Sequence, residues 1–191
     1  MTDAELVKFW KAADAERVEF GALLKLLLLT GCRLNEVAGM RRTEIDGATW
    51  TIPGERTKNA RAHVVPLPPL ARALIASVPT EGALVFTTNN ATPPSGWSKI
   101  KNRLDAAMKI PPWRLHDLRR TAATDMAEIG IAPHIIEAVL NHVSGHKSGV
   151  AGVYNRAQYG AEKEAAIERW AAHVEALIAG SRRRTSCRSI G

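Results

Sequence analysis

Two consecutive segments near the start of the chain carry apolar residues at helical spacing, and they restrict the fold more than any other feature. The first covers residues 3–14, and the second covers 16–30 and ends in a run of leucines before Gly31. This spacing predicts two helices, with the glycine as the stop of the second. The leucine run is far shorter than a membrane span and lies between Lys25 and Arg33, so we expect a soluble protein in which this segment is a core helix.

The rest of the chain predicts an α+β domain that is mainly helical and contains a small antiparallel sheet. A short helix is expected near residue 33, strands over 48–52, 63–67 and 84–88, and further helices over 70–78, 95–109, 116–129, 133–141 and 161–179. A chain of 191 residues needs only one domain, which we expect over 1–180. The tail 181–191 is polar and rich in arginine, so we expect it to be disordered.

The chain is basic, with 26 Lys and Arg residues against 19 Asp and Glu residues, a net charge of +7 and a pI near 9.8. This balance favours a polyanionic partner over an acidic small molecule. The two cysteines, Cys32 and Cys187, are too few and too far apart for a disulfide framework. Together with the lack of a recognisable secretory signal, they favour the reducing cytoplasm.

A dispersed set of cationic and imidazole side chains precedes one tyrosine in a glycine-rich segment. The set consists of Arg33, Lys58, His116, Arg119 and His142, and the tyrosine is Tyr154. A pentacoordinate phosphate carries charge on its non-bridging oxygens, which arginine forks and imidazole donors can stabilise without a metal. The set therefore suits phosphodiester chemistry with a tyrosine nucleophile, and we expect no cofactor and no metal.

Four members of this set also have an ordinary structural interpretation. His116 and Arg119 lie three residues apart, so on a helix they could reach one phosphate or simply form part of a solvated face. Arg33 could make an internal salt bridge with Glu36 at a helix start. Lys58 lies on a tight hairpin, where solvated lysines are common.

Five motifs, in this order, resemble the catalytic domain of the tyrosine recombinase (phage integrase) family: TGCRLNEV, TKNARAHVVPL, HDLRRTAAT, VLNHVSG and GVYNR. The resemblance extends over about residues 3–179. It implies that Arg33 and Arg119 clamp the phosphate and that Lys58 is the general acid for the departing 5′ oxygen. It also implies that His116 transfers a proton and that His142 occupies the second histidine position of the family.

The same resemblance identifies Tyr154 as the nucleophile, which forms a 3′-phosphotyrosine bond and frees a 5′ hydroxyl. Glu36 and Asp117 match positions that support the site. A tyrosine with a pKa near 10 is only about 0.1% ionised at pH 7, a deficit of roughly 4 kcal/mol that nearby positive charge must offset. Tyr159 is the second tyrosine, and we expect it to pack at the beginning of the last helix.

One departure from the family pattern is Asn141, where a glycine commonly precedes the histidine. Asparagine tolerates a left-handed helix end, so we expect the geometry to be retained. His142 and His146 could also be a metal pair, but the sequence offers no nearby Cys or carboxylate to complete a ligand set. We therefore expect no metal at this pair.

Double-stranded DNA is the expected partner of the chain. Phosphate contacts are expected from five basic residues: Arg56, Lys99, Lys101, Arg103 and Arg120. The apolar stripe of the helix over 161–179 could close its own domain or dock on a neighbour. The resemblance implies a homotetramer on DNA with such C-terminal docking, and a cytoplasmic, nucleoid-associated protein of a bacterial or phage-infected cell.

The resemblance also implies an N-terminal core-binding domain, which we expect to be absent because residue 1 falls almost at the beginning of the catalytic domain. Binding to DNA should then be weak and strongly dependent on salt. Three other functions remain open at this point. They are a type IB topoisomerase, a non-catalytic DNA-binding remnant and a metal-dependent nuclease, the last disfavoured by the scarcity of clustered carboxylates.

Overall fold

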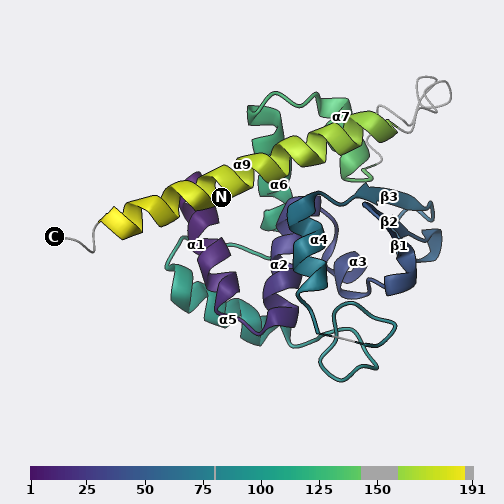
Figure 1. Ribbon diagram of the computed structural model, residues 1–191, viewed down its shortest axis with the longest axis horizontal. Coiled ribbons are helices and arrows are strands. Elements are labelled where there is room, and N and C mark those ends of the chain that lie inside the picture. Colours follow the sequence, from purple (N-terminus) through teal and green to yellow (C-terminus); the bar gives the residue numbers. More distant parts are fainter. Residues whose placement is uncertain (80, 143–158, 188–191) are drawn as a thin grey trace.

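A computed structural model of the chain describes residues 1–79, 81–142 and 159–187, with side chains as far as 181. Its described part is mainly helical with one small antiparallel sheet, as predicted (Figure 1). The helices are α1 (Asp3–Asp14), α2 (Val18–Thr30), α3 (Leu34–Ala38), α4 (Pro69–Ala76), α5 (Trp97–Met108), α6 (Asp117–Glu128), α7 (Pro133–Val139) and α9 (Gly160–Cys187). Two short 3-10 turns, Arg42–Glu44 and Gly54–Arg56, flank the first two strands.

The leucine-rich helix α2 lies at the centre of the molecule, between α1, α4, α6 and α9 (Figure 1). Nearly all of its side chains are buried, including every residue from Phe20 to Thr30. A helix that is apolar all round is stable only when other elements cover every side. The run of leucines that the sequence shows is therefore explained by central packing.

The sheet has the order β1–β2–β3, with strands β1 (Ile45–Asp46), β2 (Thr49–Ile52) and β3 (His63–Pro66). Strand β2 pairs antiparallel with β3, with Trp50 opposite Val65 and Ile52 opposite His63. The hairpin predicted between the two longer strands is thus confirmed. The short strand β1 was not predicted.

The strand predicted over 84–88 is wrong. The segment makes a single isolated bridge between Leu84 and Arg41, although Val85 and Phe86 are buried. Immediately afterwards, the Oδ1 atom of Asn89 accepts the main-chain N–H groups of Ala91 and Thr92. These side-chain bonds turn the chain before a strand can extend.

The long helix α9 crosses the molecule and packs on α7, α1, α2, α6 and β3 (Figure 1). In its apolar stripe Ile167, Trp170 and Val174 are fully buried, Leu177 is partly buried, and the Trp170 indole donates to the Leu28 carbonyl at 3.0 Å. The stripe therefore closes its own domain, one of the two alternatives predicted. The helix backbone continues to Cys187, beyond the end expected at 179 and into the segment expected to be disordered.

Candidate functional site

The centre of the candidate site is the end of α2, where Gly31 turns the chain in a left-handed conformation with φ of 62°. The left-handed backbone favours glycine, and a Cβ atom added here would lie 2.6 Å from a side-chain carbon of Leu140, which would have to shift. The predicted helix stop is thus confirmed. The turn directs the chain into α3, which begins directly after Arg33.

Arg33 and Glu36 form the internal ion pair that the sequence allowed. The carboxylate of Glu36 accepts the main-chain N–H of Arg33 at 2.7 Å and its Nη1 atom at 2.8 Å. Glu36 is buried at 3% exposure, whereas the side chain of Arg33 keeps 26% of its surface accessible. The carboxylate thus holds the arginine from inside while part of the guanidinium reaches the surface.

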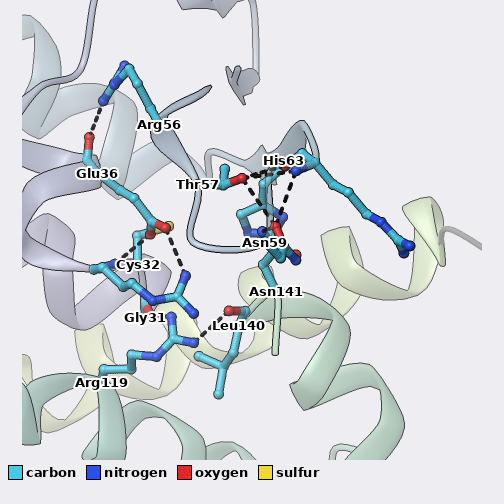
Figure 2. Close-up of polar contacts among 12 residues, drawn as sticks. Gly31, Cys32, Glu36, Arg56, Thr57, Asn59, His63, Arg119, Leu140 and Asn141 are labelled. Carbon is cyan, nitrogen blue, oxygen red and sulfur yellow. Dashed lines mark hydrogen bonds and ion pairs between the residues drawn. The ribbon is translucent and has the colours of Figure 1, made fainter. Parts of the chain in front are cut away.

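Arg119 extends from α6 into the same place, and Figure 2 shows its guanidinium directed at Leu140. Its Nη1 atom donates to the Gly31 carbonyl at 2.5 Å and its Nη2 atom to the Leu140 carbonyl at 2.6 Å. Burial, and then the positive charge of Arg33, lower the pKa of Arg119. The two guanidiniums therefore lie close enough to repel each other. An anion bound between them would offset this repulsion.

Burial raises the pKa of the Cys32 thiol, between these groups, to about 12, and the charge of Glu36 acts in the same direction. This cysteine is therefore a neutral, unreactive part of the packing at physiological pH.

Lys58 lies in the connection between β2 and β3, and its side chain is exposed. The hydroxyl of Thr57, the preceding residue, accepts the main-chain N–H of Arg61 at 3.1 Å and lies 2.8 Å from the Arg61 carbonyl. Asn59, the following residue, bonds Asn141 at the end of α7 at 2.8 Å (Figure 2). The hairpin is thus anchored on both sides of Lys58, and it lies against the α7 end that Arg119 also bonds.

Asn141 adopts the left-handed conformation predicted for it, with φ of 48°. The N–H of Asn141 donates to the Ala138 carbonyl, and the N–H of His142 donates to the Glu137 carbonyl. These two hydrogen bonds form a Schellman motif, a common way for a helix to end. His142 follows and is exposed. Tyr154 and His146 lie outside the described residues.

His116 is the cap residue of α6 and is exposed, unlike Arg119 three residues later. Asp117 accepts the main-chain N–H of Arg114 at 2.8 Å and lies 3.6 Å from the Arg120 guanidinium. The Arg114 bond, followed by Arg120, lowers the pKa of Asp117. Asp117 therefore fixes the start of the helix, and Arg120 remains exposed beside it.

The other basic residues predicted to contact DNA differ in how far their charges are already paired. Arg103 forms a two-point ion pair with Glu16, and Lys101 bonds Asp105 at 2.5 Å and stands over the Trp113 ring. Lys99 is exposed. Helix α5 lies beside α1, at the opposite side of the molecule from the sheet (Figure 1).

Arg56 faces inward. It pairs with Glu44 and donates to the Glu36 carbonyl at 2.6 Å, while Glu44 also accepts the Trp50 indole N–H at 3.0 Å. This network connects α3, which follows Arg33, to the sheet, whose β2–β3 connection contains Lys58. Arg56 is thus placed to support the site, and contact with phosphate would require it to leave these partners.

Two buried residues at the site were not recognised from the sequence. The Nε2 atom of His63 lies 3.0 Å from the Val139 carbonyl, and burial lowers the pKa of His63 to about 4. Lys163 of α9 donates to the Val64 carbonyl at 2.8 Å, and burial also lowers the pKa of Lys163. The sequence feature that could have indicated the burial of His63 is the alternation of side chains along the strand, which places His63 on the same face as buried Val65.

Two classes of feature are missing from the described part of the chain. Its His, Cys, Asp and Glu side chains form no group of three or more that could hold a metal ion. No helix there is both long and apolar enough to span a bilayer.

Comparison with known proteins identifies the family to which the chain belongs. Residues 1–160 match the phage integrase family, and the chain belongs to that family. It is 31% identical over 185 residues to prophage integrase IntZ of Escherichia coli K12, covering 93% of this chain and 45% of the relative. It is 34% identical over 161 residues to prophage integrase IntA of the same strain, covering 81% and 38%. The chain thus spans less than half the length of these relatives.

Solved structures share the fold. The lambda integrase catalytic core superposes with a TM-score of 0.59 at 17% identity, covering 74% of this chain and 94% of that chain. XerA recombinase gives a TM-score of 0.64 at 19% identity, covering 83% and 61%. XerH site-specific recombinase bound to its difH substrate gives 0.63 at 18% identity, covering 78% and 48%. The tyrosine recombinase catalytic fold predicted from the motifs is therefore confirmed.

Proposed function

We propose that this chain cleaves and rejoins DNA as the catalytic part of a site-specific tyrosine recombinase. The observation that carries the proposal is the pair of guanidiniums, Arg33 and Arg119, that converge with one buried carboxylate, Glu36, next to the Lys58 hairpin. Two positive charges against one negative charge leave a surplus at this position. A scissile phosphate would supply the missing negative charge.

In the proposed reaction the phenolate oxygen of Tyr154 attacks the phosphorus, and the bond between phosphorus and the 5′ oxygen breaks. Arg33 and Arg119 hold the non-bridging oxygens, and Lys58 gives a proton to the departing 5′ oxygen. The phenol proton passes to a base, for which His116 is our candidate, and His142 donates to the phosphate. The reverse attack by a 5′ hydroxyl rejoins the strand, so the bond energy is conserved and no nucleotide is consumed.

Double-stranded DNA is the proposed substrate, and a tetramer is the proposed assembly. Exposed Lys99 and Arg120 are the more available of the predicted phosphate contacts, Arg120 having only a 3.6 Å ion pair with Asp117. Lys101 and Arg103 would first have to leave the closer carboxylates of Asp105 and Glu16. The apolar stripe of α9 is buried in its own domain, so we do not assign contacts between subunits to it. We propose that the protein works in the cytoplasm on nucleoid DNA.

The decisive experiment uses a nicked suicide duplex from which the cleaved strand diffuses away, so that the covalent adduct accumulates. We expect a covalent adduct whose attachment maps to Tyr154. Tyr154→Phe should bind the duplex and form no adduct, whereas Tyr159→Phe, the matched control at the second tyrosine, should retain adduct formation. Attachment at another residue, or an adduct in Tyr154→Phe, would contradict the proposal.

The same assay separates the alternatives. A non-catalytic DNA-binding remnant would retain the duplex and never become attached to it. A type IB topoisomerase would form the adduct and relax supercoils without exchanging strands between two sites. Loss of cleavage on addition of a chelator would indicate a metal-dependent nuclease.

A further inference from the structure

The amide side chains of Asn59 and Asn141 form a pair that joins two parts of the site across 82 residues of sequence. The Nδ2 atom of Asn59 donates to Oδ1 of Asn141 at 2.8 Å, and the Nδ2 atom of Asn141 faces Oδ1 of Asn59 at 3.4 Å. Figure 2 shows the two side chains meeting where the hairpin approaches the end of α7. Both residues are half-buried, so the pair is partly protected from water.

Each asparagine also has local bonds that fix its own segment. The Oδ1 atom of Asn59 accepts the hydroxyl of Thr57 at 3.1 Å and lies 3.4 Å from the main-chain nitrogen of Arg61. Asn141 occupies the left-handed position that ends α7. The pair therefore connects a closed loop to a closed helix end, so movement of one segment is transmitted to the other.

The last turn of α7 is bound at three successive residues by three different elements. His63 of β3 contacts the Val139 carbonyl, Arg119 of α6 donates to the Leu140 carbonyl, and Asn59 of the hairpin bonds the side chain of Asn141. The first two contacts use main-chain carbonyls, which any residue at those positions provides. The third requires a side chain at position 141.

That requirement explains why asparagine suits position 141. Glycine is the least strained residue in a left-handed helix end, but it has no side chain that could reach the hairpin. Asparagine tolerates the same conformation and adds an amide. The immediate sequence neighbours of the pair are Lys58 and His142, and the side chains of both are exposed.

We infer that the Asn59–Asn141 pair is a positioning device that holds the Lys58 hairpin in register with the α7 end and the Arg119 clamp. This inference rests on the proposed function, because it assigns the pair to the step in which Lys58 protonates the departing 5′ oxygen. Neither asparagine takes part in the chemistry. Loss of the pair lets the hairpin move, so that Lys58 is less often within reach of the oxygen.

The test compares adduct formation on two suicide duplexes that differ in one atom. One duplex carries the ordinary 5′ oxygen at the scissile bond, and the other carries sulfur there, which leaves as a thiolate and needs no proton from an acid. The variants are Asn141→Gly, which keeps the left-handed backbone, and Asn59→Ala. Asn90→Gly is the matched control, because Asn90 also has a positive φ of 58° and is exposed in a loop outside the site.

We expect both variants to lose about tenfold in rate on the oxygen duplex, as the loss of one partly buried hydrogen bond suggests, and less than about threefold on the sulfur duplex. Lys58→Ala should show the same selectivity on a larger scale, and Asn90→Gly should match the unmodified protein on both. Equal losses on the two duplexes would overturn the inference, since a general structural defect does not depend on the leaving atom. No loss on either would also overturn it.

A second measurement, made without DNA, decides the inference even if the chain forms no adduct and the proposed function fails. Amide hydrogen exchange of Lys58 and Ala60 is followed in Asn141→Gly. We expect faster exchange in the hairpin than in the unmodified protein, with no change in Asn90→Gly. Unchanged exchange in Asn141→Gly would show that the pair does not hold the hairpin.

Discussion

Two groups of basic side chains in this molecule use their charges differently. At the end of α2, Arg33 pairs with the buried carboxylate of Glu36, and nearby Arg119 donates to two main-chain carbonyls. On α5, Arg103 pairs with Glu16 and Lys101 pairs with Asp105. The first group is inside the domain and the second is largely on its surface.

The difference shows that the number of basic residues in a segment does not identify an anion site. A carbonyl oxygen orients a guanidinium without neutralising it, so the first group keeps a surplus of positive charge in a place with little water. On α5 each of the two paired cations already has its counter-charge. An incoming phosphate therefore gains more at the arginine pair than on α5.

The largest expected effect is the loss of adduct formation in Arg119→Ala. We expect the rate on the nicked duplex to fall by about 10²–10³-fold, as is typical when one preorganised donor to a transition-state oxygen is removed. Arg119→Lys should recover only part of the rate, because an ammonium cannot donate to two carbonyls and a phosphate in the planar geometry of the fork.

Arg103→Ala is the control on α5, and we expect it to stay within about threefold of the unmodified protein. Thermal melting of each variant shows whether it is folded at the assay temperature. A full rate in Arg119→Ala would remove the distinction between the two groups.

A second effect is the dependence of folding stability on pH that comes from buried His63. The unfolded chain protonates His63 near pH 6.5, whereas the folded chain resists protonation until about pH 4. Stability is therefore complete above pH 6.5 and decreases as the pH falls toward 4, by about 3 kcal/mol from this residue. Urea unfolding at several pH values measures it.

His63→Gln should remove most of that slope. His134→Gln, at an exposed histidine on α7, should leave it unchanged. If the stability of His63→Gln depended on pH as steeply as that of the unmodified protein, the slope would have to come from other groups.

A third effect compares the carboxylates of the two groups. Glu36→Gln leaves two guanidiniums without a counter-charge in a buried place, and we expect it to lower the free energy of unfolding by about 2 kcal/mol. Glu16→Gln breaks a pair whose arginine is exposed, so its loss should be clearly smaller. Urea denaturation of the two variants side by side gives the comparison. A larger loss for Glu16→Gln would reverse our assignment of the buried and surface groups.

The smallest effect is on the salt dependence of DNA binding. Arg33→Ala should reduce the slope of log affinity against log salt by about one, because one phosphate contact is lost. Lys101→Ala, whose cation is already paired with Asp105, should change the slope by much less. Titrations at several salt concentrations test both, and a larger change for Lys101→Ala would mean that Lys101 leaves Asp105 to contact a phosphate.

Much of the fold could be predicted from the sequence because it depends on local spacing. The two N-terminal helices, the stop at Gly31 and the left-handed end at Asn141 all follow from neighbours within one helical turn. The strand predicted over 84–88 was wrong because side-chain bonds of Asn89 to the main chain turn the segment, and the apolar spacing of 84–88 carries no sign of those bonds. The buried role of His63 could not be predicted, because its partner, Val139, is 76 residues away.

The sequence by itself determined the family, the succession of elements and the residues that could act on a phosphate, because ordered motifs and residue types are properties of the chain. Only the tertiary structure decided which cations are neutralised. Arg56 and Arg103 are paired with Glu44 and Glu16, and Arg33 is paired with Glu36. Arg119 is as basic as these arginines, but it donates to two main-chain carbonyls, which do not neutralise its charge. Charge balance at a point depends on groups that folding brings together from distant positions, and no local pattern contains that information.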